Sequence, residues 1–384
     1  MKRDIELQYK TSIAAYLHTS PDHIFLYYKG RVALYAILKA MDVHQGDEVV
    51  IPAFTCVVVP NAIKYLGATP IYVDIDPVTY NADLQCLQQA ITERTKVIIC
   101  QNTFGLSSNV EQIQALAYSR RIYTIEDCTH GFGGSYHGKP NGSYCDAAFY
   151  STQWNKPFST GVGGFAWVQN PELASKIAAV NSQMEPATRK DALSLSMLYF
   201  VREKILTEKR YWWMIRLYRW LSRHNLVQGS SGGAELISTL MPDHYFKALS
   251  ATQMKKGLQN LQHLGDAMAL RKNNARIYND YLRQHGKTFV SPALFDDHSF
   301  LKFPLLVFQR EKVLEMAEKQ HIPLGEWFCS PIHPVCEHWE QWDLQGDKYP
   351  IAVEKASQML NLPTDEKNPD KVIHFLEEIN DYIL

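Results

Sequence analysis

The sequence predicts an α/β protein, with a large domain built on a doubly wound, mostly parallel sheet and a smaller α/β domain after it. Short apolar runs alternate with helical patterns from about residue 24 to residue 150, which is typical of a parallel sheet covered by helices. The chain has 384 residues, more than one ordinary hydrophobic core contains. We therefore expect a large domain at residues 1–245 and a small domain at residues 246–384.

Six apolar runs in the large domain predict strands. They lie at residues 24–28, 49–51, 69–73, 97–100, 122–125 and 146–150. The run at 97–100 is uninterrupted, as expected for a strand buried on both faces. Turn chemistry at Asp74 to Pro77 separates one strand from the next helix. Helices are expected at residues 4–17, from Gly30 to about residue 38, and at 57–66, 83–91 and 110–119.

Residues 185–245 form a helical insertion with the least regular pattern in the chain. Aromatic and basic residues mix at roughly helical spacing across 195–223. A basic aromatic helix can lie on a membrane surface, and that alternative stays open. Acidic Glu203 and Glu208 interrupt the pattern, so we favour helices that cover the substrate side or a subunit interface. The run GSSGG at 229–233 predicts a flexible joint.

The small domain is predicted to start with one long helix at residues 249–282, which bridges it to the large domain. A short strand follows at 303–307. Further helices are expected at 311–320, 349–359 and 370–382.

Composition is typical of a soluble globular protein and does not favour nucleic acid or an anionic membrane as a partner. Hydrophobic residues make up 46% and charged residues 21%, with a net charge of −1 and no basic block. The N-terminus lacks the apolar core of a signal peptide, and no apolar run is long enough to span a bilayer. Seven cysteines, an odd number scattered over the chain, favour reduced thiols and a cytoplasmic location.

Polar residues that follow two neighbouring strands suggest a pyridoxal phosphate (PLP) site. Glu126 and Asp127 follow one apolar run, and Lys156 follows the next. A lysine amine condenses with the cofactor aldehyde, and a carboxylate keeps the pyridine nitrogen protonated. Such groups converge outside the carboxyl ends of parallel strands. The alternative is that the aspartate caps a helix and the lysine is a solvated loop residue.

Several sequence blocks strengthen this interpretation because they occur in a fixed order. They are GRVALYAILKAMDVHQGDEVVIPAFTC, NAIKYLGATPIYVDIDPVTYNAD, ITERTKVIICQNTFG and IEDCTHGFGG, followed by the Lys156 loop. In this order they resemble the DegT/DnrJ/EryC1/StrS family of fold-type I PLP enzymes, best known as nucleotide-sugar aminotransferases. The resemblance is close over residues 25–180, resumes at 249–282, and is weaker at 303–332 and 360–363. It implies a mostly parallel mixed sheet between helices.

The resemblance also implies roles for individual residues. Lys156 stands where the family has the lysine that binds the cofactor covalently, and Asp127 stands where it has the partner of the pyridine nitrogen. Ser151 matches a phosphate ligand, and Gly30 and Arg31 match the phosphate-binding start of the first helix. The family usually has threonine where this chain has Arg31, which can pair with a phosphate through two hydrogen bonds. The alternative is a cation on the helix surface.

Two further positions depart from the family. Many members place an aromatic ring against the cofactor where this chain has Cys56, and Phe54 lies out of register. We expect Cys56 to pack as a small apolar wall. The family commonly has glutamine where this chain has His130, whose imidazole can donate the same hydrogen bond to the cofactor's phenolic oxygen and would add pH sensitivity. The alternative for His130 is a satisfied core histidine.

The resemblance implies an aminotransferase that moves an amino group, usually from glutamate, to a keto sugar linked to a nucleotide. It also implies a homodimer. Alternatives are a PLP-dependent sugar dehydratase, which commonly replaces the lysine, and a regulatory relative without activity, which would lose Lys156 or Asp127. Both residues are present. We expect no metal, because the cluster Cys329, His333, Cys336 and His338 does not have the spacing of a structural zinc site.

Overall fold

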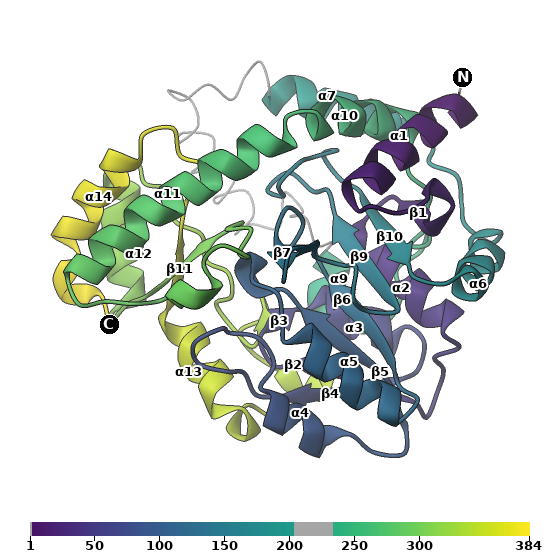
Figure 1. Cartoon of the computed structure of the whole chain (residues 1–384), viewed down its shortest axis with the longest axis horizontal. Coiled ribbons are helices and arrows are strands. Elements are labelled where there is room, and N and C mark those ends of the chain that lie inside the picture. The colour runs from purple at the N-terminus through teal and green to yellow at the C-terminus, as the bar shows by residue number, and fades with distance from the viewer. Residues whose placement is uncertain (1, 203–232) are drawn as a thin grey trace.

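The computed structural model describes residues 2–202 and 233–384. Its centre is a seven-stranded sheet with the order β1-β10-β9-β6-β5-β2-β4, flanked by helices (Figure 1). The strands are β1 (Ile24–Tyr27), β2 (Glu48–Pro52), β4 (Thr69–Val73), β5 (Thr95–Gln101), β6 (Tyr123–Asp127), β9 (Ala147–Ser151) and β10 (Gly164–Val168). The predicted α/β class with a mostly parallel mixed sheet is confirmed.

The sheet is parallel except around β10. Strands β4, β2, β5, β6 and β9 pair in parallel, whereas β10 runs antiparallel to both β9 and β1. Strand β10 was not among the six strands expected from the sequence. The five residues of β10 are all buried, so the strand is an uninterrupted apolar run like its neighbours.

Helices that alternate with these strands match the predicted rhythm. They are α1 (Lys2–Tyr16), α2 (Gly30–Ala40), α3 (Val58–Lys64), α4 (Leu84–Ala90), α5 (Val110–Ser119) and α6 (Pro171–Asn181). Helix α2 is buried along most of its length, since nine of its residues are inaccessible. It packs against β9 and β10, and its first turn therefore lies at the end of β9.

The C-terminal part adds helices around a small antiparallel sheet. Its elements are α10 (Ala251–Leu261), α11 (Leu264–Gln284), β11 (Phe303–Leu306), α12 (Arg310–Lys319), β12 (Ile332–His333), α13 (Pro350–Gln358), β13 (Met359–Leu362) and α14 (Pro369–Glu378). Strands β11 and β13 pair in the antiparallel sense. Helix α11 runs from the region of α1 and α10 to the C-terminal helices α12 and α14 (Figure 1).

The single long helix expected at 249–282 is two helices. Helix α10 ends at Leu261, and α11 begins at Leu264. His263, with φ −99° and ψ 7°, breaks the helical backbone between them. Gly265, a weak helix former, lies just beyond the break.

A parallel pairing of two short strands joins the C-terminal part to the N-terminal part that contains the seven-stranded sheet. Strand β12 pairs with β3 (Thr55–Cys56), so that His333 lies opposite Cys56. The backbone N–H of Thr55 donates to the carbonyl of Pro331, and that of Val57 donates to the carbonyl of His333, both at 2.9 Å. A loop from the end of the chain is thereby fixed against the beginning of α3.

The insertion is described only at its two ends. Helix α7 (Arg189–Phe200) begins with a capping box at Thr188, and the short helix α9 (Gly233–Ile237) returns to the body. Most of the segment 195–223, and nearly all of the joint at 229–233, lie outside the described residues. Among the helices of residues 2–202 and 233–384, none combines the length and apolar character needed to span a bilayer.

Candidate active site

The residues predicted from the sequence line one cavity at the carboxyl ends of β6 and β9. They are Gly30, Arg31, Cys56, Asp127, His130, Ser151 and Lys156. A loop of the C-terminal part completes the lining with Trp327, Phe328 and His333. The structure therefore brings all seven residues together, while their individual roles remain predictions.

Only one of the two carboxylates that end β6 faces this cavity. Successive side chains of a strand point to opposite faces. Asp127 lines the cavity, whereas Glu126 is fully buried elsewhere and accepts a 2.9 Å hydrogen bond from Nδ2 of Asn102. Burial raises the pKa of Glu126 to about 7. The backbone N–H of Thr129 donates to Oδ1 of Asp127 at 2.9 Å and fixes that carboxylate.

Lys156 lies on a loop that is closed at its base. The hydroxyls of Thr152 and Thr160 are 2.6 Å apart, and the backbone N–H of Thr160 donates to the carbonyl of Thr152 at 2.8 Å. Asn260 of α10 donates to the carbonyl of Ser159 at 2.6 Å. These contacts hold the loop as a unit, and the Lys156 side chain is only 8% exposed.

The Lys156 amine and the Asp127 carboxylate influence each other's ionisation. Burial lowers the pKa of Lys156 to about 7, while the charge of Asp127 opposes this shift and Lys302 adds to it. Burial raises the pKa of Asp127, and hydrogen bonds from Thr129 and the charge of Lys156 act in the opposite direction. A buried lysine of this kind has a large neutral, nucleophilic fraction at physiological pH.

At the end of the cavity where the phosphate is predicted to bind, the backbone at the start of α2 passes close to the end of β9. A Cβ on Gly30 would lie 2.9 Å from the carbonyl oxygen of Tyr150 and 3.0 Å from Cβ of Ser151, so only glycine fits. No side chain caps the N-terminus of α2, and its first residues line the cavity together with Ser151. An uncapped helix start beside a serine suits an anion such as a phosphate.

Arg31 is buried rather than on the helix surface. Its guanidinium pairs with Glu235 of α9, with Nη1 2.5 Å from Oε2, and the two side chains are 9% and 3% exposed. Lys29 lies 3.9 Å from the same carboxylate. Asn61 holds the Glu235 backbone by donating to its carbonyl at 2.8 Å. The sequence contained no signal for this pairing, because α9 lies in the part with the weakest family resemblance.

His130 lies in a stack of aromatic rings. Its imidazole is 4.8 Å from the Trp327 ring and 6.4 Å from the Phe104 ring, with interplanar angles of 20° and 16°. Burial lowers its pKa well below the usual value, and the charges of Lys156 and Lys302 lower it further. This shift favours the neutral form of the imidazole, and the pH sensitivity expected from His130 stays a prediction.

Trp327 is the main site residue that sequence reasoning missed. Cys56 lines the cavity without supplying an aromatic ring, and Phe54 is buried in the core. Trp327 instead places its ring centroid 4.5 Å from Nζ of Lys156. Trp327 lies within residues 303–332, where the family resemblance is weaker, and that resemblance was the available signal.

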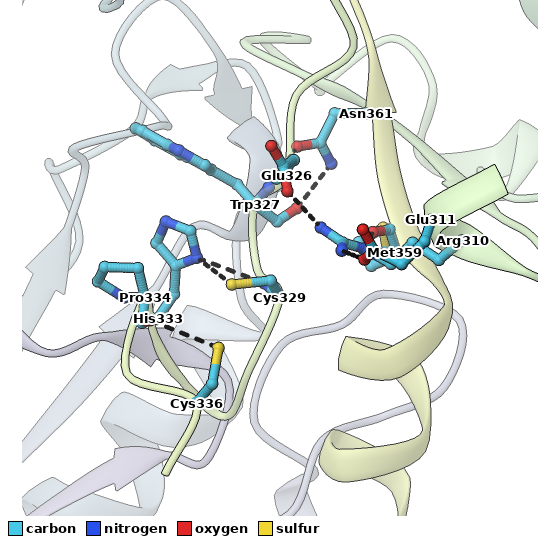
Figure 2. Close-up of polar contacts among 10 residues, drawn as sticks. All are labelled: Arg310, Glu311, Glu326, Trp327, Cys329, His333, Pro334, Cys336, Met359 and Asn361. Carbon is cyan, nitrogen blue, oxygen red and sulfur yellow. Dashed lines mark hydrogen bonds and ion pairs between the residues drawn. The ribbon is translucent and has the colours of Figure 1, made fainter. Parts of the chain in front are cut away.

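Cys329 and His333 lie side by side near the mouth of the cavity. Sγ of Cys329 is 3.2 Å from Nδ1 of His333, as Figure 2 shows, and Cys336 lies farther along the same loop. Burial lowers the pKa of His333 to about 4. Within residues 2–202 and 233–384, no group of three or more His, Cys, Asp or Glu side chains is arranged to hold a metal ion.

Known proteins with similar sequences include enzymes whose names refer to nucleotide sugars. GDP-perosamine synthase of Escherichia coli O157:H7 is 27% identical over 360 residues, which are 92% of this chain and 84% of that protein. The UDP-2-acetamido-2-deoxy-3-oxo-D-glucuronate aminotransferase of Pseudomonas aeruginosa is 41% identical over 152 residues, which are 39% and 42% of the two chains. Both are similar to this chain in sequence.

Solved structures share the fold. A DegT DnrJ EryC1 StrS aminotransferase from Brucella abortus superimposes with a TM-score of 0.74 at 21% identity, covering 97% of this chain and 89% of that one. NtdA from Bacillus subtilis, solved with bound cofactor PMP, gives 0.74 at 22% identity, covering 98% and 77%.

A model of one protein family matches almost the whole chain. It covers residues 5–197 and 245–378, and the gap between these ranges falls within the insertion. The match includes every residue predicted for the site. The chain belongs to the DegT/DnrJ/EryC1/StrS aminotransferase family.

Proposed function

We propose that this protein is a PLP-dependent aminotransferase that transfers an amino group to the keto carbon of a nucleotide-linked sugar. One observation carries the proposal. Lys156 and Asp127 are both buried and line the same cavity, in a chain that belongs to an aminotransferase family. The lowered pKa of Lys156, about 7, gives the nucleophile that cofactor binding needs. The uncapped start of α2 beside Ser151 supplies an anion site at the other end of the cavity.

Each residue has a distinct task in this proposal. When bound, PLP supplies an aldehyde that Lys156 can attack and a ring that withdraws electrons from the reacting carbon. Asp127 holds a proton at the pyridine nitrogen, which keeps that withdrawal strong. When Lys156 is not bonded to the cofactor, its Nζ removes a proton from one carbon of the reacting molecule and returns it to another. An amine whose pKa lies near neutral pH can act as both base and acid.

The remaining residues bind and orient. Gly30, Arg31 and Ser151 hold the phosphate through the start of α2 and a hydroxyl. His130, being neutral, donates a hydrogen bond to the phenolic oxygen. Cys56 closes one side of the cavity as a small apolar wall.

The substrate class follows from the relatives. Their names include a GDP-perosamine synthase, UDP-sugar aminotransferases and a dTDP-sugar 4-aminotransferase of Saccharopolyspora spinosa. All act on sugars linked to a nucleoside diphosphate, and we propose the same for this chain, with glutamate as the amino donor. A homodimer working in the cytoplasm, with a large domain at residues 1–245 and a small one at 246–384, belongs to the same proposal.

The dehydratase alternative is less well supported. A GDP-4-keto-6-deoxymannose-3-dehydratase is among the structures that share the fold, at 17% identity. Lys156 favours transamination, because such dehydratases commonly replace the lysine that returns the proton. A regulatory relative without activity is disfavoured by the same residue and by Asp127, both of which line the cavity.

The test has two parts. The purified protein is loaded with PLP, reduced with borohydride, and mapped by peptide mass spectrometry, and the expected tag is on Lys156. The PLP-loaded enzyme is then given glutamate and a panel of 3-keto and 4-keto sugars linked to UDP, dTDP or GDP, with amino-sugar formation followed by mass. Lys156→Arg keeps the positive charge and serves as the control. A tag on another lysine, or equal amination by Lys156→Arg, would contradict the proposal.

A further inference from the structure

The wall of the cavity nearest to Lys156 is an indole ring. The Trp327 ring centroid lies 4.5 Å from Nζ of Lys156 and is stacked on the imidazole of His130 at 4.8 Å. The ring is therefore supported on one side by an aromatic stack that continues through Phe328 and Phe104. A flat apolar surface therefore lies beside the amine that is proposed to transfer the proton.

Trp327 also borders a second, larger cleft. This outer cleft shares Trp327, His333 and Pro334 with the cavity. It extends along the C-terminal part and is lined by polar side chains that include Asn155, Lys302 and Lys367. Trp327 thus stands at the boundary between the buried amine and an open polar cleft, where a ligand would have to lie to reach both.

The backbone of Trp327 is held on both sides by one asparagine. Asn361, a fully buried residue of β13, accepts a hydrogen bond from the Trp327 N–H at 2.9 Å and donates to the Trp327 carbonyl at 2.7 Å (Figure 2). Its own backbone pairs with Gly325, through bonds of 2.8 and 2.9 Å. The neighbouring Glu326 is paired with Arg310 at 3.0 Å. This set of contacts fixes the backbone from which the indole extends.

The indole keeps one polar group available. In the part of the chain that the structure describes, its backbone takes part in the contacts above, but its Nε1–H donates no hydrogen bond. A tryptophan ring combines a wide apolar face with a single donor at its edge. A pyranose ring offers the complement, an apolar C–H face and hydroxyl or ring oxygens at its edge.

We propose that Trp327 is the platform on which the sugar ring of the substrate lies while Lys156 transfers the proton at the reacting carbon, and that Asn361 is the residue that positions Trp327. The proposal rests on the proposed function, because it assigns a binding contact for that function's sugar substrate. The amino donor has no sugar ring and makes no use of the platform. The two halves of the reaction should therefore respond differently to changes at Trp327.

The test compares the two halves in the PLP-loaded enzyme. Trp327→Ala is expected to raise KM for the keto sugar that the panel identifies by about tenfold, which is the size of one buried aromatic contact. Because the indole lies 4.5 Å from Nζ of Lys156, some slowing of the half-reaction with glutamate is expected as well, so the measured quantity is the ratio of the two losses, and the loss with the sugar should exceed the loss with glutamate by about tenfold. Trp327→Phe keeps an aromatic ring but loses the N–H, so its KM for the sugar should lie between the values of the wild type and of Trp327→Ala.

Several outcomes would overturn the proposal. Equal losses of rate in the half-reactions with glutamate and with the sugar would show that the indole acts on Lys156 rather than on the substrate. A fall in PLP affinity would mean that the ring contacts the cofactor. If wild-type enzyme aminates no sugar of the panel, both this proposal and the proposed function fail. If it aminates one and Trp327→Ala leaves KM unchanged, only this proposal fails.

The positioning role of Asn361 is tested by combining variants. Asn361→Ala should raise KM for the sugar as Trp327→Ala does, and the double variant should be no worse than either single variant, because both changes remove the same contact. The matched control is Asn274→Ala, since Asn274 is also buried and donates to the carbonyls of Thr364 and Glu366 without touching Trp327. Additive effects on KM, or an equal rise in the control, would show that Asn361 acts only through stability.

Discussion

The ion pair between Arg31 and Glu235 allows cofactor binding to be separated from folding stability. Both side chains are buried and their closest atoms are 2.5 Å apart. Removing one partner of a buried pair typically costs about 3–5 kcal/mol, since the other charge stays buried without compensation. Lys29, 3.9 Å from Glu235, offsets part of this loss, so we expect Arg31→Ala to cost about 3 kcal/mol.

This loss has two measurable consequences. A cost of 3 kcal/mol corresponds to a fall in melting temperature of about 6 °C or somewhat less for a chain of this size. If Arg31 also holds the phosphate, a charge-assisted hydrogen bond of about 1.5–3 kcal/mol is lost, and PLP affinity falls by roughly ten- to a hundredfold. Calorimetry of the cofactor-free protein measures the first effect, and fluorescence titration with PLP measures the second.

A double variant distinguishes the two roles of Arg31. In Arg31→Met/Glu235→Gln the buried guanidinium and carboxylate are both replaced by neutral groups of similar size, and the remaining cost is the loss of the 3.9 Å contact between Lys29 and Glu235. We expect it to recover most of the melting temperature while PLP affinity remains low. Recovery of PLP affinity together with stability, or wild-type affinity in Arg31→Ala, would refute the phosphate contact. Arg31 would then serve only as the partner of Glu235, with the phosphate held by α2 and Ser151.

Three further predictions concern the chemistry. Asp127→Asn should still bind PLP but lose at least about a hundredfold in amination rate, because the side chain no longer carries the charge that keeps the pyridine nitrogen protonated. Steady-state kinetics measures this rate, and normal turnover would contradict the role of Asp127. The rate at which cofactor-free enzyme captures PLP should rise with pH and level off above about 7, since burial lowers the pKa of Lys156 to that value and only the neutral amine reacts. Stopped-flow absorbance would instead show a rate that keeps rising well above pH 8 if Lys156 were unperturbed. His130→Gln should leave this pH profile unchanged, because burial already lowers the pKa of His130 well below the working range, and a shifted profile would contradict that assignment.

Local features of the sequence were sufficient to locate the centre of the site. Asp127 and Lys156 each follow an apolar run, and apolar runs that alternate with helices imply parallel strands whose carboxyl ends meet. Gly30 was identified from the family resemblance, because a glycine at a helix start is by itself also typical of a plain turn. These inferences need only residues close together in the chain.

Features that depend on distant contacts were not predictable. Strand β10 is an apolar run like its neighbours, and no local pattern reveals that it runs antiparallel. Trp327 and Glu235 reach the site from segments that follow Lys156 by many residues, and their partners become visible only when the chain is folded. The sequence likewise predicted the polar groups of Arg31 and His130 without the burial that determines their ionisation.

The ladder between β3 and β12 makes the site a late product of chain synthesis. Strand β3 lies near the start of the chain, and its partner residues 332–333 leave the ribosome after more than four-fifths of the sequence. Lys156 can be in its loop long before that moment, but the cavity has no wall on the side of Trp327 until β12 docks. Cofactor capture therefore reports on an assembled molecule, and a nascent chain stalled before residue 332 would fold its sheet yet remain colourless with PLP.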